Sequence, residues 1–408
     1  MKQTAKFSFM KEYDRIQIQE VCSKICSGGT PKSTVDTYYG GGIPWLNTKE
    51  VNFNRIHSTE KTITEEGLQN SSAKWIDENA VIVAMYGATA GKSAISKIRL
   101  TTNQACCNLN IDPDKADYRF VYYALYNDYN RLASLANGGA QQNLNAMQIK
   151  EFDIPYPSLE EQTTIANFLS ALDDKIELNR QINDNLEQQA QAIYKSWFID
   201  FEPFKDGEFV ESEIGLIPEG WKVGTLSDLA EITMGQSPSG KSYNECGEGI
   251  LFYQGRAEFG DRYPSIRLYT TEPSRIADQN SVLLSVRAPV GDTNIAYNKC
   301  CIGRGLASIK AKHGFNSFIF YMIKSMKDQF DMYNGEGTVF GSINRDSLNS
   351  LNVIVPTNDV INKFEKIVAP LDLKYKSLFT ENLLLTQQRD TLLPKLMSGE
   401  LKINELDC

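Results

Sequence analysis

The sequence predicts an α+β fold with two β-rich globular domains, each followed by a long helix. Three observations lead to this prediction. The second half of the 408-residue chain repeats the first half, each half ends in a heptad pattern of apolar residues, and short apolar runs separated by Gly and Pro fill the rest. We expect the two helices to form an antiparallel coiled coil with pseudo-two-fold symmetry, because the repeat runs in the same order twice.

The heptad pattern is the strongest part of the repeat. Apolar residues recur at alternating steps of four and three, and the same phase returns 199 positions later, with a polar interruption at both Asn183 and Asn382. We favour packing of the two helices on each other; the alternative is that each helix packs only on its own globular domain. The predicted seam consists of Ile165, Leu169, Leu172, Ile176, Leu186 and Ile193 in the first helix and Phe364, Val368, Leu371, Tyr375, Leu378, Leu385 and Leu392 in the second.

Proline marks where each helix begins. Both helices follow a strand that ends in proline, at Pro157 and Pro356, because proline stops a strand and permits a helix start just beyond it. The predicted order is a globular domain at 1–158, a helix at 159–200, a linker at 201–221, a second globular domain at 222–356 and a second helix at 357–398.

The net charge of −9 is unevenly distributed. Residues 159–200 hold 3 Lys+Arg against 8 Asp+Glu, and residues 201–231 hold 2 against 8. In contrast, residues 1–158 hold 17 against 16, and residues 232–356 hold 13 against 11. The acidity therefore lies in a helix and a linker, and both globular domains can present local basic faces.

Composition argues against a membrane protein, a secreted protein and a zinc protein. No apolar run approaches the ~20 residues that span a bilayer, and no apolar stretch follows the charged N-terminus, so we expect a cytoplasmic protein. The eight cysteines form no CxxC pair, and the chain has only two histidines. We therefore expect buried thiols and no metal site.

The stretch from Gly87 to Ser93 resembles a phosphate-binding loop, but only three residues separate Gly87 from the Gly-Lys-Ser sequence where four are needed. A hairpin turn is the better prediction. No other nucleotide-binding, hydrolase or adenine-methylation motif is present, and the pair Asp173 and Asp174 is interpreted as a solvated helix face. The sequence therefore predicts a chain that is not an enzyme and holds no cofactor of its own.

The globular domains instead offer turns rich in hydrogen-bond donors and aromatic side chains. Arg and Lys suit guanine edges and phosphates, and Asn and Gln suit adenine edges. The candidate DNA-binding residues are Thr30, Lys32, Tyr39, Trp45, Lys49, Tyr86, Thr89, Lys92, Gln141 and Gln142 in the first domain and Gln236, Ser239, Lys241, Tyr243, Arg256, Arg262, Arg287 and Arg304 in the second.

Five stretches resemble the specificity subunits of type I restriction–modification systems. The resemblance extends over essentially the whole chain and implies two target-recognition domains, each reading one half of a split double-stranded DNA site. The stretches are 27–31, 155–197, 218–221, 301–307 and 392–401.

The resemblance also implies partners. The paired helices would space the two domains and dock two methylation subunits, and a motor-nuclease restriction subunit would complete the complex. S-adenosylmethionine, ATP and magnesium would belong to those partners. The competing hypothesis is a non-catalytic coiled-coil adaptor with two protein-binding modules, which would suit the net negative charge better.

Overall fold

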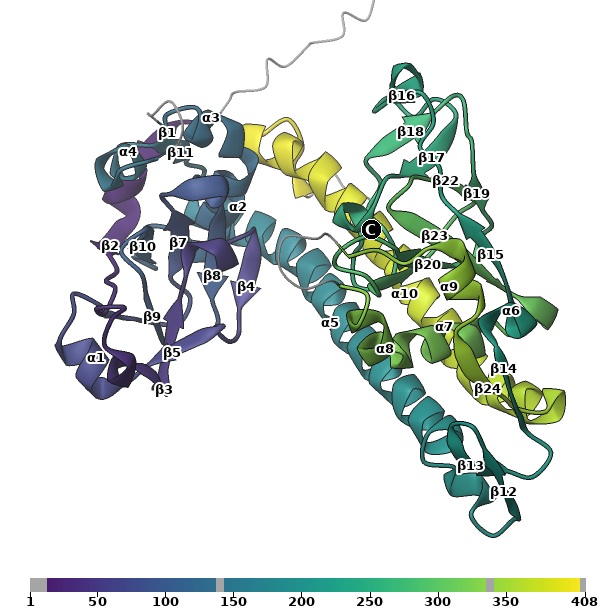
Figure 1. Ribbon diagram of the computed structural model, residues 1–408. Coiled ribbons are helices and arrows are strands. Elements are labelled where there is room, and N and C mark those ends of the chain that lie inside the picture. Colours follow the sequence, from purple (N-terminus) through teal and green to yellow (C-terminus); the bar gives the residue numbers. More distant parts are fainter. Residues whose placement is uncertain (1–12, 137–142, 335–340, 404–408) are drawn as a thin grey trace, which may run out of the picture. The chain divides into compact units, whose positions relative to one another are not determined.

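The computed structural model describes residues 13–136, 143–334 and 341–403, which form two compact units (Figure 1). Unit 1 holds the described residues up to Leu178 and those from Glu381 onward, and unit 2 is Asn179–Thr380. The chain passes between the units inside two long helices, α5 (Leu159–Phe198) and α10 (Asn358–Ser398). Each unit therefore contains a β-rich domain and part of each long helix, which confirms the predicted α+β class.

The β-rich domain of unit 1 is built from two sheets. One has the strand order β2-β10-β7-β8-β4, and the other has the order β5-β3-β9-β6. The first sheet comprises β2 (Cys22–Ser27), β4 (Asn54–Ile56), β7 (Val81–Ala84), β8 (Ser93–Ser96) and β10 (Cys106–Ile111). The second comprises β3 (Tyr39–Leu46), β5 (Lys61–Ile63), β6 (Trp75–Ile76) and β9 (Leu100–Thr102).

Unit 2 repeats this framework with the orders β15-β23-β20-β21 and β16-β18-β17-β22-β19. In both units the second sheet contains one parallel pair, β3 with β9 and β17 with β22. The first sheet comprises β15 (Ala230–Met234), β20 (Val282–Ser285), β21 (Thr293–Ile295) and β23 (Leu306–Ala311). The second comprises β16 (Tyr243–Asn244), β17 (Ile250–Tyr253), β18 (Leu268–Thr270), β19 (Ile276–Ala277) and β22 (Cys300–Ile302).

Short helices and small strand pairs complete each unit. Strands β1 (Arg15–Gln17) and β11 (Asp153–Pro155) pair in unit 1, as β14 (Lys222–Thr225) and β24 (Asn352–Val355) do in unit 2. Strands β12 (Phe209–Ser212) and β13 (Gly215–Pro218) form a hairpin after α5. The short helices are α1 (Glu65–Gln69), α2 (Tyr118–Asn127), α3 (Tyr129–Ala133) and α4 (Ala146–Lys150) in unit 1 and α6 (Leu226–Leu229), α7 (Asn316–Ser325), α8 (Lys327–Asp331) and α9 (Arg345–Asn349) in unit 2.

The two long helices run antiparallel within each unit. In unit 1, Ile165 and Leu169 near the start of α5 share a core with Leu396 near the end of α10. In unit 2, Tyr194 near the end of α5 packs edge-on against Phe364 near the start of α10, with ring centroids 6.0 Å apart. Every predicted seam residue is buried or half-buried, as expected for a helix face covered by a partner helix.

A buried arginine attaches the β-rich domain of unit 2 to both helices. Arg262 is 3% exposed, and its Nη1 lies 3.0 Å from Glu187 of α5 while its Nη2 lies 2.5 Å from Asp372 of α10. Lys324 of α7 lies 2.6 Å from Glu187, and the Tyr321 hydroxyl donates to Asp372 over 2.9 Å. Burial acts to raise the pKa of Glu187, but Arg262 and Lys324 outweigh it and hold this pKa below its ordinary value.

Unit 1 uses the repeat counterpart of Asp372 in the same way. Asp173 of α5 accepts a hydrogen bond of 2.6 Å from the Tyr123 hydroxyl of α2 and lies 2.7 Å from Arg389 of α10. The interpretation of the acidic pair as a solvated helix face is therefore wrong for Asp173, which is half-buried and ion-paired. Its neighbour Asp174 is exposed, although it pairs with Arg55 of β4.

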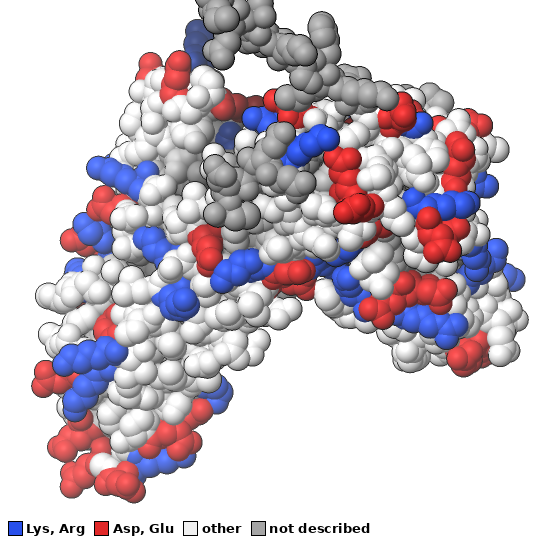
Figure 2. Space-filling view, turned by 180° about the vertical axis from the view of Figure 1, so that it is seen from behind, with Lys and Arg blue, Asp and Glu red and all other residues white. Residues whose placement is uncertain are grey.

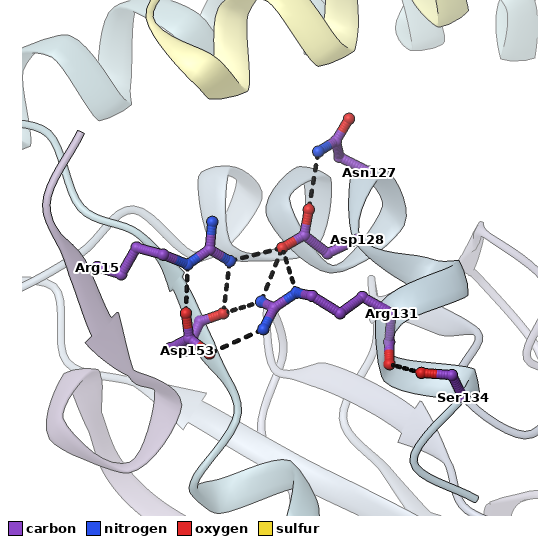
Figure 3. A network of polar contacts seen from close by, with 6 residues as sticks. All are labelled: Arg15, Asn127, Asp128, Arg131, Ser134 and Asp153. Atoms are coloured by element: carbon purple, nitrogen blue, oxygen red, sulfur yellow. Dashed lines mark hydrogen bonds and ion pairs between the residues drawn. The ribbon is translucent and has the colours of Figure 1, made fainter. Parts of the chain in front are cut away.

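A network of two arginines and two carboxylates holds the strand β1 against β11 and α3 (Figure 3). Arg15 Nη2 lies 2.6 Å from Asp128, and Arg131 lies 2.8 Å from both Asp128 and Asp153. Arg15 also pairs with Asp153. Partial burial acts to raise the pKa of Asp153, but hydrogen bonds from Arg131 and Arg15 outweigh it and lower this pKa. Because both arginines are partly exposed, the network orients β1 more than it stabilises the fold.

Candidate nucleic-acid interface

Four turns of unit 2 meet where β15, β17, β20 and β22 end. We call them turn cluster 2, which comprises residues 235–237, 254–255, 286–287 and 303–305. Backbone hydrogen bonds of 2.8–2.9 Å join the turns, from the amides of Gly235, Gly303 and Val286 to the carbonyl groups of Leu306, Tyr253 and Gly305 respectively. Loops fixed on a rigid framework in this way are common sites of recognition.

Glycine permits the close approach of these turns. A Cβ atom at Gly235 would lie 2.1 Å from the carbonyl oxygen of Gly303, and one at Gly303 would lie 2.9 Å from the carbonyl oxygen of Gln254. Residues with side chains could not occupy either position without moving the backbone. The side chains of the neighbouring residues therefore project from turns that are in backbone contact.

Unit 1 builds an equivalent set of turns, which we call turn cluster 1. It comprises residues 28–30, 47–48, 85–86 and 103–105. The amide of Gly29 donates to Thr102 over 2.8 Å, and that of Met85 donates to Ala105 over 2.8 Å. A Cβ atom at Gly28 would lie 2.1 Å from the carbonyl oxygen of Thr102. The same backbone geometry thus appears once in each unit.

Turn cluster 2 presents exposed arginine and glutamine side chains. Arg287 and Arg304 are exposed, as is Arg275, whose carbonyl oxygen accepts a hydrogen bond of 2.9 Å from Ile302. Among the residues that the structure describes, none of these three guanidinium groups has an ion-pair or hydrogen-bond partner. Gln236 is exposed beside them. Within the described residues, these groups therefore keep donors that an external acceptor could use.

Turn cluster 1 presents mostly uncharged side chains. Tyr86 is 44% exposed, and Gln104 is exposed and accepts a hydrogen bond from the Thr30 hydroxyl. Lys74, the counterpart of Arg275, is also exposed. The two clusters therefore share a framework and differ in chemistry.

Fourteen of the eighteen candidate residues named from the sequence fall into three groups. Five lie in the turn clusters: Thr30, Tyr86, Gln236, Arg287 and Arg304. Lys32, Ser239 and Lys241 are exposed on the turns that follow. Six others make internal contacts, with Tyr39 bonded to Pro31, Lys49 paired with Glu60, Thr89 bonded to Thr48, Lys92 bonded to Asn52, Tyr243 bonded to Pro238 and Arg256 paired with Asp292.

Two candidates are corrected by their burial. Trp45 is 4% exposed, and its indole nitrogen donates to the Gly29 carbonyl over 2.9 Å, so it supports turn cluster 1 from beneath. Arg262 is the buried ion-pairing residue described above. Neither side chain can reach DNA. Gln141 and Gln142 lie outside the described residues.

The sequence prediction missed Gln104 and Arg275. Gln104 occupies the position in turn cluster 1 that Arg304 occupies in turn cluster 2, at a repeat offset of 200. Arg275 immediately precedes β19, as Lys74 precedes β6. A strict alignment of the two repeats around these short strands would have found both residues.

The loop from Gly87 to Ser93 joins the antiparallel strands β7 and β8, so the hairpin prediction is confirmed. Its lysine is engaged within the domain, because Lys92 Nζ donates to Asn52 Oδ1 over 2.7 Å. The residue before the loop, Tyr86, belongs to turn cluster 1. The resemblance to a phosphate-binding loop is therefore superficial.

Acidic side chains are concentrated in the segment that follows α5. Residues 201–231 hold 2 Lys+Arg against 8 Asp+Glu, and the end of unit 2 that carries the β12–β13 hairpin is predominantly red in Figure 2. Elsewhere on this face the two signs of charge are mixed. Much of the net negative charge of the chain therefore lies in this segment.

In residues 13–136, 143–334 and 341–403, no helix is long and apolar enough to cross a membrane. The same residues contain no group of three or more His, Cys, Asp or Glu side chains placed to hold a metal ion.

The chain carries two versions of one turn cluster on two copies of one β-framework. This arrangement defines a recognition protein with two binding domains. Comparison with known proteins gives its family. The model of the type I restriction modification DNA specificity domain matches residues 10–188 and 218–373. The chain belongs to this family.

Relatives match along the full length. The chain is 31% identical to a putative type I restriction enzyme MjaX specificity subunit of Methanocaldococcus jannaschii, over 98% of this chain and 96% of the relative. It is 30% identical to the MjaIX specificity subunit of the same organism, over 99% and 97%. The crystal structure of a type I S subunit from M. genitalium is 19% identical, with a TM-score of 0.60 over 97% of this chain and 98% of that one, and this likeness shows the fold.

Proposed function

We propose that this chain is the DNA-recognition subunit of a type I restriction–modification complex and reads a bipartite double-stranded DNA site. Each turn cluster reads one half of the site. The observation that carries the proposal is the duplication of the donor-bearing turns on one framework, together with the difference in their side chains. Two like frameworks with unlike side chains suit a split site with two different half-sequences.

The remaining activities are assigned to partner subunits. The helices α5 and α10 dock two methylation subunits, and a motor-nuclease subunit joins the assembled complex. S-adenosylmethionine, ATP and magnesium serve those partners, and this chain contributes recognition without catalysis. An adaptor for protein ligands is not favoured, because the family is a DNA specificity family. Affinity of the complex for DNA is expected to fall steeply with salt, since phosphate contacts release counterions.

Exchange of one β-rich domain tests the proposal. Residues 13–157 are replaced by the matching block of a relative with a different site, so that β1 and β11, which pair through Arg15 and Pro155, move together. The complex with methylation subunits is expected to change one half of its methylated site and keep the other. Exchange of residues 222–356 should change the other half. A change in both halves after either exchange would contradict the proposal.

The hairpin loop provides a second test. Because Lys92 bonds to Asn52 inside the domain, Lys92→Ala is expected to leave ATP hydrolysis per DNA-bound complex within about twofold of wild type. The measurement is ATPase rate at saturating DNA, with DNA affinity determined separately. Loss of ATP binding at unchanged DNA affinity would show that this loop contacts nucleotide.

A further inference from the structure

Four pairs of equivalent residues with different side chains distinguish the two units; three pairs lie in the turn clusters, and the fourth lies just before β6 and β19. Backbone contacts define the equivalence: Val286 bonds to the turn that holds Arg304, just as Met85 bonds to the turn that holds Gln104. The isolated β-bridges repeat as well, since Tyr86 pairs with Asn143 and Arg287 with Ser342. The equivalent pairs, unit 1 first, are Thr30 and Ser237, Lys74 and Arg275, Tyr86 and Arg287, and Gln104 and Arg304.

Arginine at positions 287 and 304 favours hydrogen bonds to one particular base, guanine. A guanidinium group donates two parallel hydrogen bonds to O6 and N7 of guanine, whereas a glutamine amide matches N6 and N7 of adenine. Lysine would suffice for phosphate, but it lacks this planar pair of donors. Arg287 and Arg304 are exposed, and the described part of the chain offers no partner to either side chain.

The backbone holds these two arginines close together. Val286, which precedes Arg287, donates to Gly305, which follows Arg304, over 2.9 Å. The amide of Arg304 is also within 3.4 Å of the Ser237 hydroxyl. The turns are thus anchored at their backbones, while the described residues provide no partner for the two guanidinium groups. A side chain that recognises a base needs a backbone held in place and hydrogen-bond donors that are not already bonded.

We propose that Arg287 and Arg304 recognise guanine in the half-site of unit 2, and that unit 1 reads its half-site without an arginine–guanine contact. The inference rests on the function proposed above. In unit 1, Tyr86 and Gln104 occupy the same places, and the Thr30 hydroxyl donates to the Gln104 carbonyl oxygen, which leaves the amide nitrogen free to donate to adenine N7. The two half-sites therefore differ in base composition because the clusters differ in side chains.

The test uses the full chain assembled with its methylation subunits. The methylated site of the wild-type complex is mapped, and the half read by unit 2 is identified by the domain exchange. Binding is then measured to duplexes in which each guanine of that half is replaced in turn. Arg304→Gln is expected to reduce discrimination for one guanine by about 5- to 150-fold, with the other half-site unchanged. Arg304→Lys keeps the charge but lacks the planar pair of donors, so it should retain only part of the same discrimination.

Two further variants keep the proposal falsifiable. Gln104→Arg should introduce a guanine preference in the half-site of unit 1. Lys299→Ala removes an exposed cation at the opposite end of β22 and should change neither half-site. Thermal melting of each variant confirms that the fold is retained.

The outcomes separate the inference from the proposed function. A wild-type complex with no bipartite site would contradict the proposed function itself, and the inference with it. A bipartite site whose unit 2 half lacks guanine would overturn the inference alone. So would an Arg304→Gln complex that binds all sequences more weakly by one common factor, because that result identifies a phosphate contact.

Discussion

Replacing Arg262 with alanine is expected to lower the free energy of unfolding of unit 2 by about 3–5 kcal/mol, because removal of one partner leaves buried charges without compensation. Arg262 is 3% exposed and contacts Glu187 at 3.0 Å and Asp372 at 2.5 Å. Its guanidinium also lies 4.6 Å from the centre of the Tyr375 ring. One side chain therefore links the β-rich domain to both long helices.

Hydrogen exchange measured by peptide would locate this loss. Protection of α7 in unit 2 should fall in Arg262→Ala, and protection of α2 in unit 1 should stay unchanged. Arg256→Ala is the matched control, because Arg256 is 51% exposed and pairs with Asp292 at 2.8 Å; its loss should cost at most about 1 kcal/mol. Equal effects of the two substitutions would show that the buried contacts do not attach the domain.

The effect of Arg262→Ala should also depend on pH. The pKa of Glu187 is lowered in the folded chain because Arg262 and Lys324 outweigh the effect of burial. Such a group stabilises the fold above its ordinary pKa of 4.5, and this stabilisation disappears as the pH falls through the lower folded value. The difference between wild type and variant should therefore be full at neutral pH and shrink in acid. A difference that grows below pH 4 would contradict the assignment.

Periodic features of the sequence predicted the fold well. The seam from Ile165 to Leu392 follows the heptad pattern because apolar spacing directly reports which helix face is covered. The strand-rich domains were predicted from apolar runs and turn residues. The prediction that the two helices pair with each other rested on the internal repeat, because the heptad pattern of one helix does not identify the partner that covers it.

Long-range polar contacts were not predictable from the same patterns. Arg262 was predicted to be a surface donor, because sequence patterns do not reveal partners as distant as Glu187 and Asp372, which lie 75 and 110 positions away. Asp173 read as a solvated residue for the same reason, although Arg389 pairs with it across the helices. The sequence predicted donor-rich turns, but only the backbone contacts identify which of them meet.

Lengthening both long helices is expected to widen the gap between the two half-sites. The chain passes between the units only inside α5 and α10, so residues inserted into both helices at this boundary lengthen both connections between the units. Seven residues add about 10 Å at a rise of 1.5 Å each, and a whole heptad keeps the seam in phase. With base pairs about 3.4 Å apart, the gap should grow by about two or three base pairs.

The two insertions must face each other, and the structure specifies where. Lys175 Nζ lies 3.6 Å from Glu381, and Asn382 Nδ2 donates to the Ile176 carbonyl over 3.3 Å. Because the helices are antiparallel, the points after Leu178 and after Thr380 lie at about the same level. Insertion after Asn183 and Asn382, which are equivalent in the repeat, would instead shift one helix against the other, since Asn382 faces Ile176.

Methylation mapping of the lengthened complex measures the result. Both half-sequences should be unchanged, because neither turn cluster is altered, and only the number of base pairs between them should increase. Three base pairs also rotate the DNA by about a third of a turn, so the lengthened complex should bind its new site more weakly than wild type binds the original. A five-residue insertion at the same points is the control, since it turns the apolar seam by about 140° and should impair assembly. An active seven-residue variant with an unchanged gap would mean that the helices hold the partner subunits without measuring the DNA.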